Sequence, residues 1–162
     1  MMRTAKVTHV KLPPELLERG FWIYVWQIGL PNGGTVHYVG MTGDTGSYKA
    51  QSPFKRVTDH LGFNERGNPL RRYLTAKGAE PEKCRSLDFF AYGPIGIVPE
   101  EKERYRKERG KVAALERSLC LLLRSKDLEV LHDDPPCNFE YDERVWQMMT
   151  AAFSEHFQAL RG

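Results

Sequence analysis

Tyr24 and Tyr38 are the first residues whose type and spacing could do chemistry. Each is the central tyrosine of a strand-like run, at residues 22–26 and 36–42. A phenol has an ordinary pKa near ~10, so it orients or deprotonates a water only where a neighbouring base, a metal or positive charge activates it. A strand tyrosine taken singly is more typical of a core aromatic with a satisfied hydroxyl. The meaning of this pair therefore depends on the groups beside it.

Arg56 and His60 lie four positions apart in a helix-like segment, and Glu116 lies at the edge of an apolar stripe rather than in a charge run. An arginine offers a fixed fork of donors for a phosphate, and a lone carboxylate suits Mg²⁺, which keeps most of its waters. Phosphodiester hydrolysis needs an activated water, charge stabilisation and help for the leaving oxygen. The alternatives are a surface Arg–His pair and a helix-edge carboxylate bonded to Arg117 or Lys111.

Five elements of the sequence follow one another in a recognisable order. They are Ile23-Tyr24, the run Tyr38-Val39-Gly40-Met41-Thr42, Arg56-x-x-x-His60, Glu116 and Asn138. In this order, each on its expected kind of secondary structure, they resemble the GIY-YIG nuclease superfamily, and the resemblance spans residues 22–138. The sequence departs from the family in two places: Trp22 stands where the first motif has its glycine, and the loop after Gly40 is longer than in the smallest members.

The resemblance implies an endonuclease, of restriction or repair type, that hydrolyses DNA phosphodiester bonds with Mg²⁺ or Mn²⁺. It implies that Tyr24 and Tyr38 handle the nucleophilic water, Arg56 and His60 act on the phosphate and the leaving group, Glu116 binds the metal, and Asn138 supports the site. Asn138 follows Pro135-Pro136 and could instead bridge loop backbone. Two other classes stay open: a nucleic-acid-binding module that kept the fold and lost catalysis, and a protein-interaction domain that docks through its last helix.

Positive charge is concentrated in one part of the chain. The net charge is +3, yet residues 49–85 hold nine Lys or Arg against four Asp or Glu. Such a segment attracts a polyanion, because each cation that meets a phosphate releases a counterion. The alternative is a merely solvated surface. For a nucleic-acid partner we expect contacts from Lys49, Lys55, Arg71 and Arg72, with Thr42 beside them.

The three cysteines, Cys84, Cys120 and Cys137, are odd in number and show no zinc spacing. They favour a reducing, cytoplasmic location. No apolar run approaches the roughly 20 residues of a membrane span, and no signal-peptide pattern is present, so we expect no membrane partner. A homodimer is compatible with the sequence.

The elements that must position these groups are marked by glycine and proline. Pro31-Asn32-Gly33-Gly34 predicts a hairpin whose first strand begins at Phe21, and Ser52-Pro53 predicts a helix that ends at Leu61. Asn68-Pro69 opens a second helix, which runs to Lys77. Residues 87–92 form a third strand.

The second half of the chain is predicted to be mainly helical. A charged helix over 100–109 is bent or interrupted by Gly110 before an apolar helix with Val112, Leu115 and Leu119, and a last helix covers 142–160. The predicted fold class is α+β: a small, mainly antiparallel three-stranded sheet flanked by helices. We expect a single domain over 1–162, with the motif region at 21–140.

Overall fold

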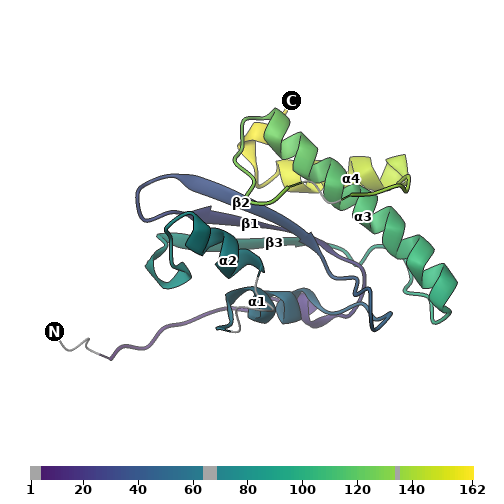
Figure 1. Ribbon diagram of the computed structural model, residues 1–162, viewed down its shortest axis with the longest axis horizontal. Helices are drawn as coiled ribbons and strands as arrows, with labels where there is room; N and C mark the ends of the chain where they lie inside the picture. Colours follow the sequence, from purple (N-terminus) through teal and green to yellow (C-terminus); the bar gives the residue numbers. More distant parts are fainter. Residues whose placement is uncertain (1–4, 64–68, 134–135) are drawn as a thin grey trace.

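The protein is built on a three-stranded antiparallel sheet. A computed structural model describes residues 5–63, 69–133 and 136–162. The strands are β1 (Ile23–Gly29), β2 (Thr35–Met41) and β3 (Ser86–Tyr92), in the order β2-β1-β3 (Figure 1). Both pairings of β1 are antiparallel. The predicted α+β fold class is therefore confirmed, including the hairpin of consecutive strands.

The hairpin places the two tyrosines on neighbouring strands, two positions apart in the register. Tyr24 lies opposite Gly40, and Trp26 lies opposite Tyr38. Gly33 adopts φ 103°, which its lack of a side chain allows in the turn. The strand begins at Ile23 rather than at Phe21 as predicted, because Trp22 turns its amide to the side chain of Thr42 instead of to a ladder partner.

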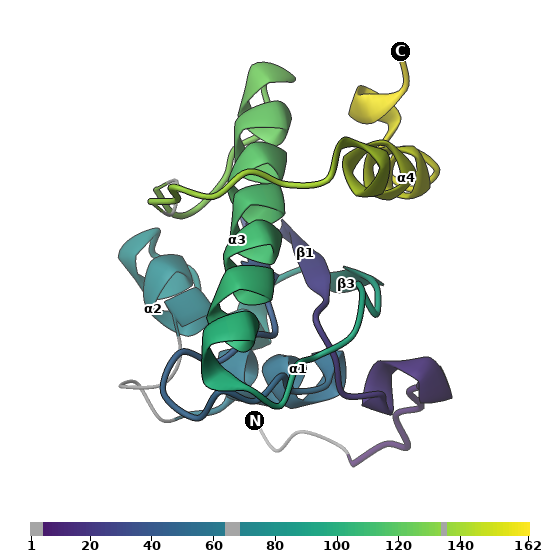
Figure 2. The ribbon, with the colours of Figure 1, turned by 90° about the vertical axis from the view of Figure 1, so that its right-hand side faces the viewer.

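Side chains of β1 alternate between two hydrophobic clusters, one on each face of the sheet. Ile23 and Val25 pack with the apolar stripe of the long helix α3 (Lys102–Ser125) and with α4 (Glu143–Ser154). Tyr24, Trp26 and Ile28 pack with α2 (Pro69–Ala76). Figure 2 shows α3 running between α2 on one side and α4 on the other. Tyr24 therefore points away from the larger core.

Helix α1 (Pro53–Leu61) has the predicted bounds. The Ser52 hydroxyl accepts the amide of Lys55 at 3.2 Å, which caps the first turn. The predicted start of the second helix at Asn68 lies outside the described residues, and α2 ends at Ala76, one residue before the predicted end. Helix α1 alone carries both Arg56 and His60 toward the sheet.

Helix α3 is continuous, so the predicted interruption at Gly110 is wrong. Gly110 is buried inside the helix, and a Cβ built there would meet the ring of Phe139 at 2.5 Å. The glycine permits a close approach rather than a break. The last helix also differs from the prediction: α4 ends at Ser154, and a separate 3₁₀ turn, Gln158–Leu160, follows.

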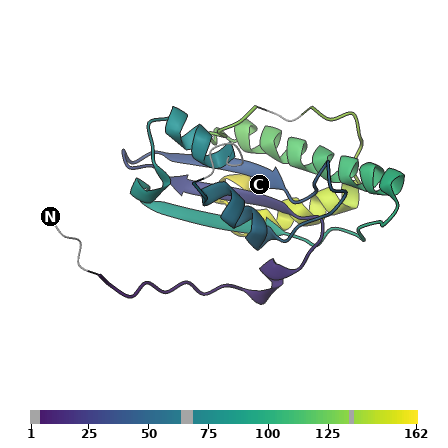
Figure 3. The same cartoon turned by 60° about the horizontal axis from the view of Figure 1, so that its bottom comes forward.

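Three short segments complete the described chain. The extended residues 5–13 run along the outside of the folded body to the 3₁₀ turn Pro14–Leu17 (Figure 3), and a second 3₁₀ turn, Pro81–Lys83, precedes β3. The three cysteines are free thiols. Within the described ranges, no helix combines the length and apolar character needed to cross a membrane.

Candidate active site

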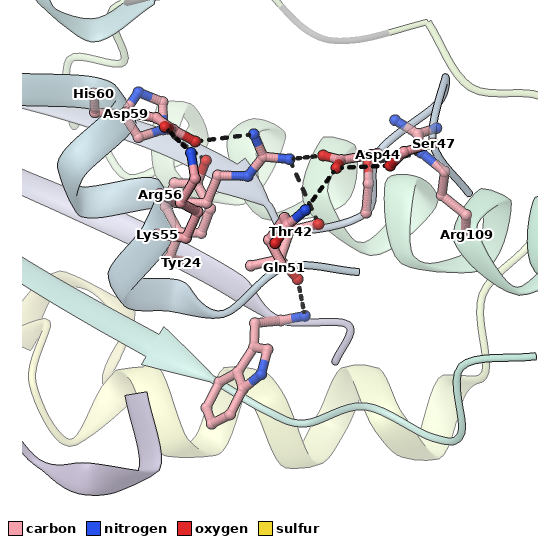
Figure 4. A network of polar contacts seen from close by, with 12 residues as sticks. Tyr24, Thr42, Asp44, Ser47, Gln51, Lys55, Arg56, Asp59, His60 and Arg109 are labelled. Atoms are coloured by element: carbon pink, nitrogen blue, oxygen red, sulfur yellow. Dashed lines mark hydrogen bonds and ion pairs between the residues drawn. The ribbon is translucent and has the colours of Figure 1, made fainter. Parts of the chain in front are cut away.

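Five of the six residues predicted to be catalytic line one cavity. Tyr24, Tyr38, Arg56, His60 and Glu116 surround a polar space of about 370 Å³. They come from β1, β2, α1 and α3, so residues up to 92 positions apart meet there. Figure 4 shows part of this cluster, with Arg56 between two carboxylates and Tyr24 beside the helix that bears His60.

A glycine on the neighbouring strand gives Tyr24 its place. A Cβ on Gly40 would lie 2.3 Å from the Tyr24 hydroxyl oxygen, so any other residue there would displace the ring. The ring lies next to this strand position, and its hydroxyl lies 2.7 Å from the His60 Nε2 atom. Gly40 of the Tyr38-Val39-Gly40 motif thus leaves the space that the Tyr24 side chain occupies.

The Tyr24–His60 pair is neutral in the folded protein. Burial, and then the proximity of Tyr38, raises the pKa of Tyr24 well above its ordinary value. Burial, and then the positive charge of Arg56, lowers the pKa of His60 to about 4. A neutral imidazole can accept a proton, whereas a buried phenol with a raised pKa is a proton relay rather than a standing phenolate.

Tyr38 lies half-buried on the other side of the histidine. Its ring centroid is 5.0 Å from that of His60 and 4.6 Å from that of His132. Burial raises its pKa, and the negative charge of Glu116 raises it further. Tyr38 is therefore also a hydroxyl donor in this state, facing the same cavity.

Arg56 is held by two carboxylates that the sequence reasoning missed. Its Nη2 atom donates to the Asp44 Oδ1 atom at 2.5 Å, and its Nη1 atom lies 3.7 Å from the Asp59 Oδ2 atom. Asp44 is itself fixed by the Ser47 hydroxyl and the Gln51 side-chain amide (Figure 4). The guanidinium is thus pre-oriented at the cavity wall, but its Nη2 atom is already bonded to Asp44.

Glu116 is the carboxylate best suited to a metal. It is partly buried, and within the described ranges it has no ion pair. Burial raises its pKa to about 7, although Arg109 and Arg56 act in the opposite direction. No group of three or more His, Cys, Asp or Glu ligands occurs among the described residues. A single carboxylate in a polar cavity fits Mg²⁺, which retains several waters, better than it fits zinc.

Arg109 also lines the cavity and was missed. Its Nε atom donates to the Gly43 carbonyl at 2.9 Å, which ties α3 to the loop after β2. It lies seven residues before Glu116, hence on the same face of the helix. The signal was present in the sequence, but the predicted break at Gly110 separated the two residues.

Two predicted site residues lie elsewhere. Asn138 lines an adjoining cavity of about 460 Å³, which shares Thr45 and Arg109 with the first. Thr42 has no exposed surface. Its hydroxyl donates to the Gly20 carbonyl at 2.5 Å and accepts the Trp22 amide at 2.9 Å. The predicted nucleic-acid contact of Thr42 is therefore wrong, and its side chain instead joins the start of β1 to the end of β2.

The four basic residues expected to contact DNA differ in the contacts that their side chains already make within the protein. Lys55 is paired with Asp59. Arg71 donates to the carbonyls of Leu61 and Gly62 and to Glu82, so it is fixed in a structural role. Arg72 lies over the ring of Tyr73 at 5.6 Å. Lys49 is exposed and lines a separate cavity.

Comparisons of the chain with models of protein families, with curated proteins and with solved structures find no match.

Proposed function

We propose that the protein is a metal-dependent endonuclease of the GIY-YIG type that hydrolyses DNA phosphodiester bonds. The observation that supports this proposal is the convergence of Tyr24, Tyr38, Arg56, His60 and Glu116 on one polar cavity from four separate elements. Each group has a task in phosphodiester hydrolysis, and all five line the same cavity.

The tyrosines position the attacking water. In the tautomer with its proton on Nδ1, neutral His60 accepts the Tyr24 hydroxyl proton while the phenol oxygen takes a proton from the water. The water oxygen forms the new bond to phosphorus, the bond from phosphorus to the leaving oxygen breaks, and the leaving oxygen takes a proton from solvent water. Tyr38 can donate to an oxygen in the same space.

The charged residues stabilise the phosphate. Arg56 and Arg109 present guanidinium groups at the cavity wall, where developing negative charge on the phosphate oxygens is stabilised most. Glu116 would hold Mg²⁺ or Mn²⁺ through its carboxylate. A bound divalent ion supplies Lewis-acid charge for the non-bridging and leaving oxygens.

One contact favours the alternative of a nucleic-acid-binding module without catalysis. Arg56 forms an ion pair with Asp44. This ion pair uses a guanidinium N–H group that would otherwise be free to bind a phosphate. An active enzyme must open this pair when DNA binds. A binding module can keep it closed.

We also propose a cytoplasmic location, and a homodimer that acts on DNA is compatible with the sequence. The free thiols of Cys84, Cys120 and Cys137 fit a reducing compartment. Light scattering of the purified protein tests the dimer: a monomeric mass at working concentration would contradict it.

An assay of supercoiled-plasmid cleavage tests the proposed nuclease activity. The reactions contain Mg²⁺, Mn²⁺ or EDTA, and compare wild type with Glu116→Gln. Glu108→Gln is the matched control, because Glu108 is a solvent-facing carboxylate of the same helix paired with Lys111. We expect nicking that needs the metal, that survives in Glu108→Gln and that is lost in Glu116→Gln. Salt-sensitive binding without cleavage in any metal would favour the binding module.

A further inference from the structure

A second cavity opens beside the central one and continues away from it along α3. It has a volume of about 460 Å³, and its walls include Arg106, Arg109, Tyr48, Asn138 and Phe139. Arg109 belongs to both cavities. Arg109 therefore lies at the boundary between the central cavity and the second cavity.

Tyr48 contacts two cations, of which Arg106 lines this second cavity and Lys102 lines a neighbouring one. Its backbone has a φ of 51°, an uncommon conformation for a residue with a side chain. The Lys102 Nζ atom lies 5.4 Å from the ring centroid, the Arg106 Cζ atom lies 5.0 Å from it, and the Arg106 guanidinium also donates to the hydroxyl. The loop after β2 thus holds both cations in place.

These cations are available to a phosphate, unlike Lys55 of α1 and Arg71 of α2. Arg106, Arg109 and Lys102 have no carboxylate within 4.0 Å among the residues that the structure describes, whereas Lys55 and Arg71 are paired. Residues 102, 106 and 109 lie on one face of α3 and span ~10 Å of helix. That length matches about three base-pair steps of ~3.4 Å along the axis of double-stranded DNA.

An exposed aromatic side chain lies across the same cavity. Phe139 is 49% exposed, and its ring lies against the bare backbone of Gly110, where a Cβ would be only 2.5 Å away. The ring therefore packs against the helix on one side and is exposed to solvent on the other. Exposed aromatic rings serve as stacking platforms for bases, and the neighbouring Asn138 carries an amide of the kind that reads base edges.

We propose that the DNA strand leaves the central cavity past Arg109, and that the nucleotide next to the cleaved phosphate binds in the second cavity. Arg106 contacts its phosphate, and Phe139 stacks on its base. This inference rests on the proposed function. It places the strand along α3 and the loop at 43–50, rather than along α1 and α2.

Binding measured in the Glu116→Gln background tests the path, since binding is then observed without cleavage. A fluorescent 20-base-pair duplex is titrated at several salt concentrations with this protein and with added Arg106→Ala, Phe139→Ala or Phe139→Leu. Arg104→Ala is the charge control on the same helix, and Phe63→Ala is the aromatic control, because Phe63 is 81% exposed beside Arg71.

Arg106→Ala should weaken binding and lower the slope of log K against log salt by about 1. Both Phe139 variants should bind roughly tenfold more weakly with an unchanged slope; Phe139→Leu keeps an apolar side chain against Gly110, so its loss reports stacking rather than misfolding. Both controls should bind like the background protein. Tight, salt-sensitive binding that neither Arg106 nor Phe139 affects would overturn the path alone, whereas a background protein that binds no DNA would overturn the proposed function with it.

Discussion

Glu116→Gln is expected to change how the stability of the metal-free protein depends on pH. Burial raises the pKa of Glu116 to about 7, whereas the ordinary value is 4.5. The folded state therefore favours the protonated carboxyl, and this contribution to stability is fully present below pH ~4.5 and is lost as the pH rises through about 7. The difference between these two pKa values, at ~1.4 kcal/mol per pH unit, corresponds to about 3 kcal/mol.

His60 changes the pH dependence of stability in the direction opposite to Glu116. Its pKa falls from 6.5 to about 4 on burial beside Arg56. Its contribution is present above pH ~6.5 and is lost as the pH falls through about 4, again with a size of about 3 kcal/mol. In wild type the slopes due to Glu116 and His60 therefore nearly cancel between pH ~4.5 and ~6.5. Removing the carboxylate leaves the slope due to the histidine uncompensated.

Urea unfolding in EDTA, from pH ~4.5 to ~8, measures this difference directly. The free energy of unfolding of Glu116→Gln, relative to wild type, should rise by about 3 kcal/mol across this range. Glu108→Gln, with its solvent-facing carboxylate, should follow wild type. A difference between Glu116→Gln and wild type that stays constant with pH would refute the reasoning that burial perturbs this carboxyl group.

Three further predictions concern Gly40, Thr42 and metal binding by Glu116. Gly40→Ala places a methyl 2.3 Å from the Tyr24 hydroxyl oxygen and should destabilise the protein by about 1–3 kcal/mol in urea unfolding; Gly46→Ala, where nothing lies within 4 Å, should be nearly neutral, and equal effects would contradict the packing. Thr42→Val removes a buried hydroxyl with two partners and should cost about 1–3 kcal/mol by thermal unfolding, and an unchanged midpoint would argue against its bridging role. Mg²⁺ should raise the melting temperature of wild type but not of Glu116→Gln, because only a ligand that binds the folded state stabilises it; an equal rise in both would place the metal elsewhere.

The elements that carry the tyrosines and Arg56 could be predicted because their signals are local. Gly33 in its turn and Ser52 at its cap each dictate a backbone conformation within a few residues. The fold class followed from these signals and from the apolar pattern of the strands. The arrangement of the sheet, with β1 in the centre, depends on contacts between distant residues, and the sequence did not specify it.

The parts that could not be predicted depend on contacts across the fold. Gly110 has the local signature of a helix break, but Phe139 packs against it and the helix continues. Arg109 was missed for the same reason. Lys55 looked available for DNA, and only the folded α1 shows its ion pair with Asp59. Thr42 was expected beside the DNA contacts, yet it is buried between the ends of two strands.

The most direct measurement is the rate at which Tyr24→Phe nicks plasmid DNA in Mg²⁺, compared with wild type. The phenylalanine ring can keep its place over Gly40, so the variant removes only the hydroxyl that bonds to His60. If this pair relays the proton of the attacking water, the single-turnover rate should fall by ~10²–10⁴-fold while DNA binding is unchanged. Equal rates for the two proteins would contradict the proposal that this cavity is the active site of a nuclease.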